Sequence, residues 1–217
     1  MSAIIFLIQK EIQSEWRQKY AFNGLLLYVI STVFVCYLSF RQIVDLPTWN
    51  ALFWIIQLFA GVNAISKSFL QEGRGRMLYY YTLTNARSFI IAKIIYNLLL
   101  MLVLSSFNLI FYSLFIGNPV IDMPMFLIAM FLGSAGFSAV LSMVSAIASK
   151  AGNNFALMSI LSFPILIPLL MVTIRFSKNA MDGLAWSVNQ NFAVILVALI
   201  SMVFGLSYLL FPYLWRD

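Results

Sequence analysis

Long apolar runs separated by short polar stretches dominate the chain. Six of the runs are long enough to cross a bilayer, since a spanning helix needs about 20 mainly apolar residues. We expect these spans at 22–40, 49–66, 89–116, 124–148, 155–174 and 192–214. The pattern predicts an all-α integral membrane protein with six transmembrane helices, forming a single domain over residues 1–217.

The stretch before the first run, residues 3–19, has a different pattern. Ile5, Ile8, Ile12 and Trp16 recur at helical spacing, while charged and amide side chains occupy the other faces. An amphipathic helix of this kind lies in the membrane interface instead of crossing it. An amphipathic helix packed on the rest of the protein would show the same pattern, and this alternative stays open.

Composition and charge agree with a membrane protein and set its orientation. Hydrophobic residues make up 63% of the chain and charged residues 9%, whereas soluble domains carry about 25% charged residues. With both termini in the cytoplasm, ten of the 13 Lys and Arg residues fall on that side, and only Arg41, Arg175 and Lys178 fall on the other. The net charge of +6 is therefore a topology signal and implies no nucleic-acid partner.

The residues that usually carry catalysis or bind metals are scarce. The chain has no histidine and one cysteine, Cys36, and every carboxylate lies near the edge of an apolar run. It also lacks an ATP-binding loop of the G-x-x-x-x-G-K-[ST] type and any metal-binding motif. We therefore predict a non-catalytic protein with no catalytic, cofactor-binding or metal-binding residues, so that any use of ATP would require a partner.

The fourth run contains small residues at a spacing of about one helical turn. They are Gly133, Ser134, Ser138, Ser142 and Ala146. Small residues at this spacing allow helix backbones to approach closely in lipid. We predict a helix-packing face, and packing within the chain is favoured over an interface between subunits.

The fifth run contains Pro164 and Pro168. Each proline removes a backbone donor and bends a helix, and their spacing puts both on nearly one face. Carbonyls freed by a bend must find partners in protein or water. We therefore expect a kinked, mobile span lining the bundle interior or a wet cavity, with a plain structural kink as the alternative.

The densest polar stretch, FLQEGRGRMLYYY at residues 69–81, lies between the second and third spans. An aromatic belt with positive-inside charges would explain its tyrosines and arginines. It would not explain the order of acid, glycines and apolar turn, so we predict that a cytoplasmic partner binds the 67–88 loop. The predicted coupling residues are Phe69, Glu72, Gly73, Arg74, Gly75, Arg76, Leu78 and Arg87.

Three segments resemble the haem exporter protein B (CcmB) family of type-2 ABC exporter permeases. They are FAGVNAISKSFLQEGRGRMLYYYTLTNARSFIIAKIIYNLL at 59–99, SAIASKAGNNFALMSILSFPILIPLLMVTIR at 145–175, and the N-terminal IQKEIQSEWRQK. Two departures concern the loop. Tyrosines 79–81 replace leucines, and Thr84 or Asn85 stands where the family has a proline before the arginine that corresponds to Arg87.

The resemblance implies a multi-pass permease in the bacterial inner (cytoplasmic) membrane, serving cytochrome c maturation. It implies a cytoplasmic ABC ATPase partner that binds the ATP, a haem-handling membrane protein, a haem chaperone, and a possible homodimer within the complex. This chain would bind no cofactor directly, while the complex handles haem. Two alternatives remain: a type-2 ABC exporter permease for a lipid, glycan or drug, and a non-transporting membrane scaffold.

Overall fold

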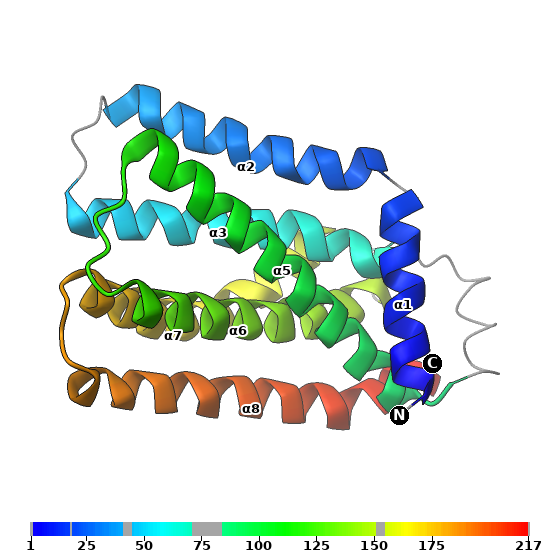
Figure 1. The fold of residues 1–217 in the computed structure, drawn as a ribbon. Helices are drawn as coiled ribbons and strands as arrows, with labels where there is room; N and C mark the ends of the chain where they lie inside the picture. The colour runs from blue at the N-terminus through cyan, green and yellow to red at the C-terminus, as the bar shows by residue number, and fades with distance from the viewer. Residues whose placement is uncertain (1, 18, 41–44, 71–83, 151–154, 217) are drawn as a thin grey trace.

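The computed structural model describes residues 2–17, 19–40, 45–70, 84–150 and 155–216, and every regular element in these ranges is an α-helix (Figure 1). The elements are α1 (Ser2–Arg17), α2 (Lys19–Phe40), α3 (Leu46–Leu70), α5 (Ala86–Ile116), α6 (Met123–Lys150), α7 (Phe155–Met181) and α8 (Trp186–Arg216). The central part of the predicted coupling loop, residues 71–83, lies outside the described residues.

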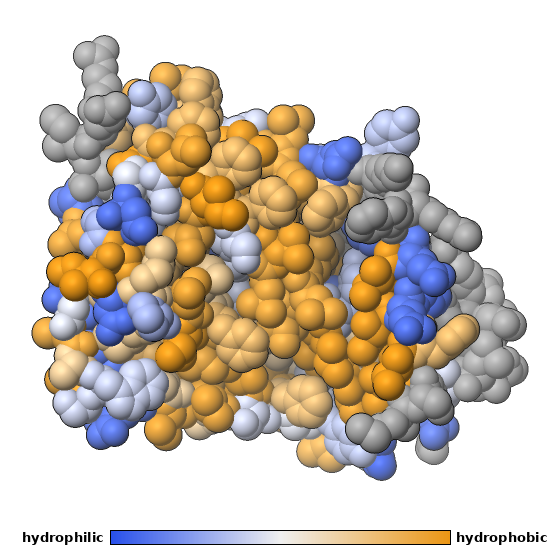
Figure 2. All heavy atoms as spheres, in the orientation of Figure 1, coloured by the Kyte–Doolittle hydropathy of each residue, from blue (hydrophilic) through white to orange (hydrophobic). Residues whose placement is uncertain are grey.

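Six of these helices, α2 to α8, are long and apolar enough to cross a membrane. They confirm the predicted all-α membrane fold and its six spans. The shorter, less apolar α1 runs across one end of the bundle, the end at which both chain termini lie (Figure 1). Hydrophobic side chains form a broad band across the middle of the molecule, and hydrophilic ones gather toward its two ends (Figure 2).

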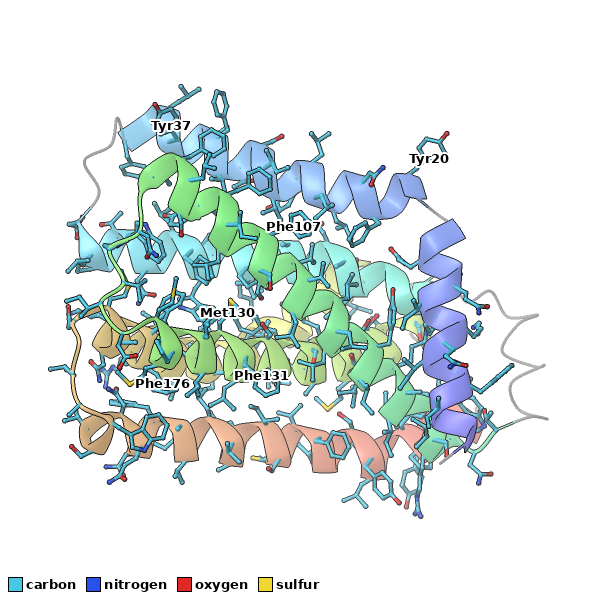
Figure 3. All side chains as sticks on the ribbon, viewed as in Figure 1. Tyr20, Tyr37, Phe107, Met130, Phe131 and Phe176 are labelled. Atoms are coloured by element: carbon cyan, nitrogen blue, oxygen red, sulfur yellow. The ribbon has the colours of Figure 1, made fainter. Side chains whose placement is uncertain are left out.

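Aromatic side chains mark the two ends of α2. Tyr20 lies at its start, is 94% exposed and points away from the bundle, while Tyr37 lies near its other end (Figure 3). Tyrosines are enriched at both membrane–water interfaces, where the ring meets apolar groups and the hydroxyl meets water. The two residues are therefore placed as expected for a helix that spans the hydrocarbon layer between them.

The boundary between the last two spans differs from the prediction. We expected the fifth span to end at residue 174 and the sixth to begin at 192, but α7 continues to Met181 and α8 already begins at Trp186. The inward face of α7 stays buried at Phe176 and Met181, although Arg175 and Lys178 point outward and are exposed. The two basic residues, predicted to follow the span, thus lie in its final turns.

The end of α7 is fixed by backbone geometry. Gly183 has φ +69°, a left-handed conformation that glycine adopts without strain. The amide of Leu184 donates to the carbonyl of Asn179 at 3.0 Å, and the amide of Gly183 donates to that of Ala180 at 3.3 Å. This pair of bonds is the Schellman arrangement that closes a helix C-terminus, so the connection to α8 is a tight turn.

Helix α6 lies at the centre of the bundle and packs against α3, α5, α7 and α8. All five residues of its predicted packing face, which are Gly133, Ser134, Ser138, Ser142 and Ala146, are buried inside the chain. A Cβ atom at Gly133 would come within 2.7 Å of ring carbons of Trp54. A close approach of α3 to α6 therefore requires glycine there, and these small residues pack within the chain.

The prolines of α7 lie on its outer face. Both Pro164 and Pro168 are exposed, whereas Ser162, Leu166 and Leu169 form the buried side of the same helix. The span expected to line the bundle interior therefore does so through the face opposite the prolines, and the prolines themselves point away from the bundle. The proline spacing correctly indicates a shared face, but it does not tell which face is buried. The mobility of this span stays a prediction.

Candidate functional site at the start of α5

The predicted coupling loop leaves and re-enters the bundle at one end. Helix α3 ends at Leu70 and α5 begins at Ala86, both at the end that carries the two termini and α1 (Figure 1). We call this the loop end. Glu72, Gly73, Arg74, Gly75, Arg76 and Leu78 lie outside the described residues. Phe69 is in the last turn of α3, and Arg87 is the second residue of α5.

An ion pair joins α1 to α5 at the loop end. The Lys93 ammonium lies 3.0 Å from Oε2 of Glu11, whose other oxygen lies 3.0 Å from the ammonium of Lys10. One turn further along each helix, the hydroxyl of Tyr96 donates to Oε2 of Glu15 at 3.2 Å. Residues three or four apart share one face of a helix, so each helix presents two matched groups to the other.

The ion pair between Lys93 and Glu11 is buried, and its surroundings shift the pKa of Glu11. The side chain of Lys93 is only 2% exposed and that of Glu11 14%. Burial by itself would raise the pKa of Glu11, but the charges of Lys93 and Lys10 and the hydrogen bonds they donate hold this pKa below its ordinary value of 4.5. Glu11 is therefore ionised at neutral pH and holds α1 on α5.

The first turns of α5 also pack on α8. The guanidinium of Arg87 lies over the ring of Tyr208, 4.9 Å from its centroid. The Phe89 ring contacts those of Phe211 and Trp215, with centroids 5.9 and 5.0 Å away. A cation over an aromatic ring contributes about 0.5–1 kcal/mol where it is exposed. The start of α5 is thus held between α1 and the end of α8.

Beyond these turns, buried polar side chains continue along α5 into the bundle. We call them the α5 polar stripe: Lys93, Asn97, Ser105, Asn108 and Tyr112. Asn97 donates to Ser142 of α6 at 2.7 Å, and Ser105 shares hydrogen bonds with Ser134 of α6 and Gln57 of α3. Asn108 and Tyr112 each donate to a backbone carbonyl of α3 at 3.2 Å. The stripe ties α5 to both α3 and α6.

The stripe is not fully satisfied by hydrogen bonds. The side-chain carbonyl oxygens of Asn97, Asn108 and Gln57 are buried and accept no hydrogen bond from the described residues. A buried group left in this state costs about 1–3 kcal/mol. Buried acceptors without hydrogen bonds are uncommon in native structures, and stored conformational strain is one explanation for them. These three oxygens are available to accept hydrogen bonds from water or from donors brought near by a rearrangement.

Sequence reasoning missed both the α1–α5 contact and the α5 polar stripe. The available signal for the contact was the spacing of Glu11 and Glu15, one turn apart on α1. The signal for the stripe was the recurrence of polar residues on one face of the third apolar run. Within the described ranges, no cluster of three or more His, Cys, Asp or Glu side chains could hold a metal ion.

Comparison with known proteins identifies the family of the chain. A protein-family model described as CcmB protein matches residues 2–212. No match was found among curated proteins or among solved structures. The matched range includes α1, the predicted coupling loop, the first five spans and most of α8.

Proposed function

The chain belongs to the CcmB family, whose members are membrane subunits of haem-export ABC transporters, and we propose that it couples ATP hydrolysis by a partner to haem delivery. In this proposal a cytoplasmic ABC ATPase binds and hydrolyses ATP. The complex also contains a haem-handling membrane protein and releases the haem-loaded chaperone for cytochrome c maturation. The chain described here is the non-catalytic permease subunit.

One observation carries the proposal beyond the family match. Residues 71–85 connect α3 to α5 on the same end of the bundle as both termini and α1 (Figure 1). A partner that binds this connection holds the ends of two spans at once. The first turns of α5 are fastened to α1 and α8, so a displacement there is passed to three helices together.

The proposed mechanism is a shift between two arrangements of the bundle. Closure of the ATPase on ATP moves the 67–88 loop, and the loop tilts α3 and α5. The α5 polar stripe offers alternative hydrogen bonds, because two of its buried acceptors, on Asn97 and Asn108, and the neighbouring Gln57 of α3 have no donor among the described residues. Two discrete arrangements of packed helices are the usual means by which a local displacement becomes a global change.

The test is charge reversal at Glu72. A loop that only decorates the membrane interface should tolerate it, because exposed ion pairs contribute about 0–1 kcal/mol. A carboxylate docked in a partner's cleft should not, because breaking a buried pair costs about 3–5 kcal/mol. We expect Glu72→Arg to weaken association with the ATPase about 100-fold or more and to reduce the yield of covalently haem-loaded cytochrome c.

The matched control is Asp182→Arg, which reverses an exposed carboxylate at the opposite end of the bundle. It should leave both ATPase pull-down and cytochrome yield unchanged, with membrane insertion equal in the two variants. Wild-type behaviour of Glu72→Arg in both assays would show that this loop is not the coupling element.

The proposed orientation places both termini in the cytoplasm of a bacterium whose inner membrane holds the protein. A reporter fused after Arg216 should therefore lie in the cytoplasm. A reporter inserted within residues 117–122 should lie on the external side of the membrane. The excess of Lys and Arg at the loop end supports this orientation. An external C-terminus would contradict it, and would remove the loop from the reach of any cytoplasmic ATPase.

A further inference from the structure

The outward face of α7 carries two backbone carbonyls that lose their usual helical donor. Proline has no amide hydrogen, so Pro164 and Pro168 cannot donate to the carbonyls four residues earlier, which belong to Ile160 and Pro164. The side chains around these carbonyls are exposed, with Ile160 at 67% and Ile167 at 51%. Both prolines lie in the middle third of α7, where a spanning helix meets lipid chains that donate no hydrogen bonds. A protein helix that brings donors to this face would therefore stabilise it.

The outward face of α8 offers a donor at the same depth. Ala198, Ser201 and Gly205 share this face, and a Cβ atom at Gly205 would meet nothing within 4 Å. Such small residues let a second helix approach closely. Helices α7 and α8 run in opposite directions from the turn at Gly183 (Figure 1), so depth can be counted from that turn. Pro164 lies 17 residues before the end of α7 and Ser201 lies 15 residues after the start of α8, about 25 and 22 Å at 1.5 Å per residue.

The two faces remain complementary toward the end of the bundle opposite the loop end. There α7 carries the exposed cations Arg175 and Lys178, while α8 carries the exposed amides Gln190 and Asn191. All four lie within about 10 Å of the turn that joins the helices. Amide oxygens accept hydrogen bonds from both cations. Pairing α7 with α7 of a second copy would instead place like charges together, which is unfavourable.

We propose that α7 and α8 form a symmetric interface with a second copy of this chain, in which α7 of each copy packs on α8 of the other. A twofold axis along the membrane normal keeps every residue at its depth and makes each contact twice. Such an interface needs two faces of one chain that match at equal depth. The hydroxyl of Ser201 donates to the carbonyl of Pro164 of the partner subunit. The interface uses no residue of the coupling loop and does not rest on the proposed function.

The first test is cross-linking of the full chain in native membranes, with Cys36 replaced by Ala. Two differently tagged copies are expressed together, one carrying Ile167→Cys on α7 and the other Ala198→Cys on α8. A short bis-maleimide should join them into a dimer that carries both tags. The control replaces the first copy by Leu27→Cys, at a position that is 65% exposed on α2, and should give no dimer.

The second test measures dimerisation of the full chain in phospholipid vesicles, by energy transfer between labelled copies as lipid is added. Gly205→Leu should abolish the dimer, while Gly24→Leu on α2 should not, because a Cβ at either glycine meets nothing within 4 Å and both variants should fold. Ser201→Ala should weaken dimerisation about tenfold, because symmetry removes two interhelical hydrogen bonds at once. Ser106→Ala, at an exposed serine of α5, should have no effect.

Several results would overturn this interface. One is the absence of a cross-linked dimer from the mixed pair, and another is an equal yield from the control at Leu27. Dimerisation of Gly205→Leu or Ser201→Ala at the wild-type level would do the same. A cross-link from position 167 to a different membrane protein would also overturn it, because a partner of another kind would then cover α7.

Discussion

Removing the charge of Glu11 tests whether the α1–α5 contact depends on its buried ion pair. The variant Glu11→Gln keeps the size of the side chain and its position on α1. It removes the negative charge that lies 3.0 Å from the Lys93 ammonium. Because Lys93 is only 2% exposed, water cannot replace that charge without opening the interface between α1 and α5.

The expected loss of stability follows from the burial of the two side chains. Breaking a buried ion pair by removing one partner costs about 3–5 kcal/mol. Glu11 retains 14% exposure and Gln can still accept a hydrogen bond, so we expect a value of about 3 kcal/mol, at the lower end of that range. For a chain of this size, each kcal/mol lowers the unfolding temperature by about 2–4 °C, which gives a decrease of about 6–12 °C.

The assay is thermal unfolding in detergent, organised as a double-mutant cycle. The four proteins are the wild type, Glu11→Gln, Lys93→Met and the double variant. The double variant should be destabilised less than the sum of the single variants by about 1 kcal/mol or more. Effects that add within about 0.5 kcal/mol would refute the reasoning. Lys10→Met is the matched control, since Lys10 contacts the same carboxylate from a position that is 32% exposed and should cost about 1 kcal/mol at most.

The same pair predicts a pH dependence with a defined sign. The pKa of Glu11 in the folded protein lies below its ordinary value of 4.5, so folding favours the ionised form. The stabilisation is therefore complete above pH 4.5 and is lost as the pH falls through the lower folded-state pKa. The difference in unfolding temperature between the wild type and Glu11→Gln should be constant from pH 6 to 8 and should shrink only in acid below pH 4.5.

Two further predictions concern the helix faces. Gly133→Val should destabilise the bundle by about 1–3 kcal/mol through overpacking, because the Cβ of the valine would lie 2.7 Å from the Trp54 ring. Thermal unfolding measures this loss of stability. An unchanged unfolding temperature would contradict the close approach of α3 to α6. Replacing Pro164 and Pro168 together by Ala should straighten α7 and lower the yield of haem-loaded cytochrome c without loss of the protein from the membrane, whereas a normal yield would leave the pair as a plain kink.

The fold was predictable from the sequence because lipid imposes a simple rule on apolar runs. Every backbone group in the hydrocarbon layer must be bonded internally, so a run of about 20 apolar residues forms a helix whatever it packs against. The rule places a helix end incorrectly where the helix continues past the end of its uninterrupted apolar run. At Arg175 the hydropathy falls while Phe176 and Met181 keep the inward face buried, and α7 therefore extends to Met181.

The partners of each helix were harder to predict than its existence. The pattern of α1 indicated an amphipathic helix, but periodicity gives a face and not the surface that it meets. The structure shows α1 packed on the rest of the protein, and its place in the membrane interface stays a prediction. Leu7 and Glu11 are turned toward the protein, while Ile5 and Ile12 are exposed. The central residues of the coupling loop, 71–83, lie outside the described residues, and their role stays a prediction.

The α5 polar stripe is relevant to the proposed coupling because it ties α5 to α3 and α6. Averaged hydropathy hides the stripe, because leucine, isoleucine and phenylalanine surround each of its members in the sequence. In a bilayer, however, polar side chains on one face must turn toward protein, and this fixes the rotation of α5 against α3 and α6. Hydrogen bonds are directional, so a shift of α5 along its axis must exchange partners at Asn97 and Asn108 together. In the proposed mechanism, a displacement at Ala86 would therefore have to exchange these hydrogen-bond partners before α5 could move.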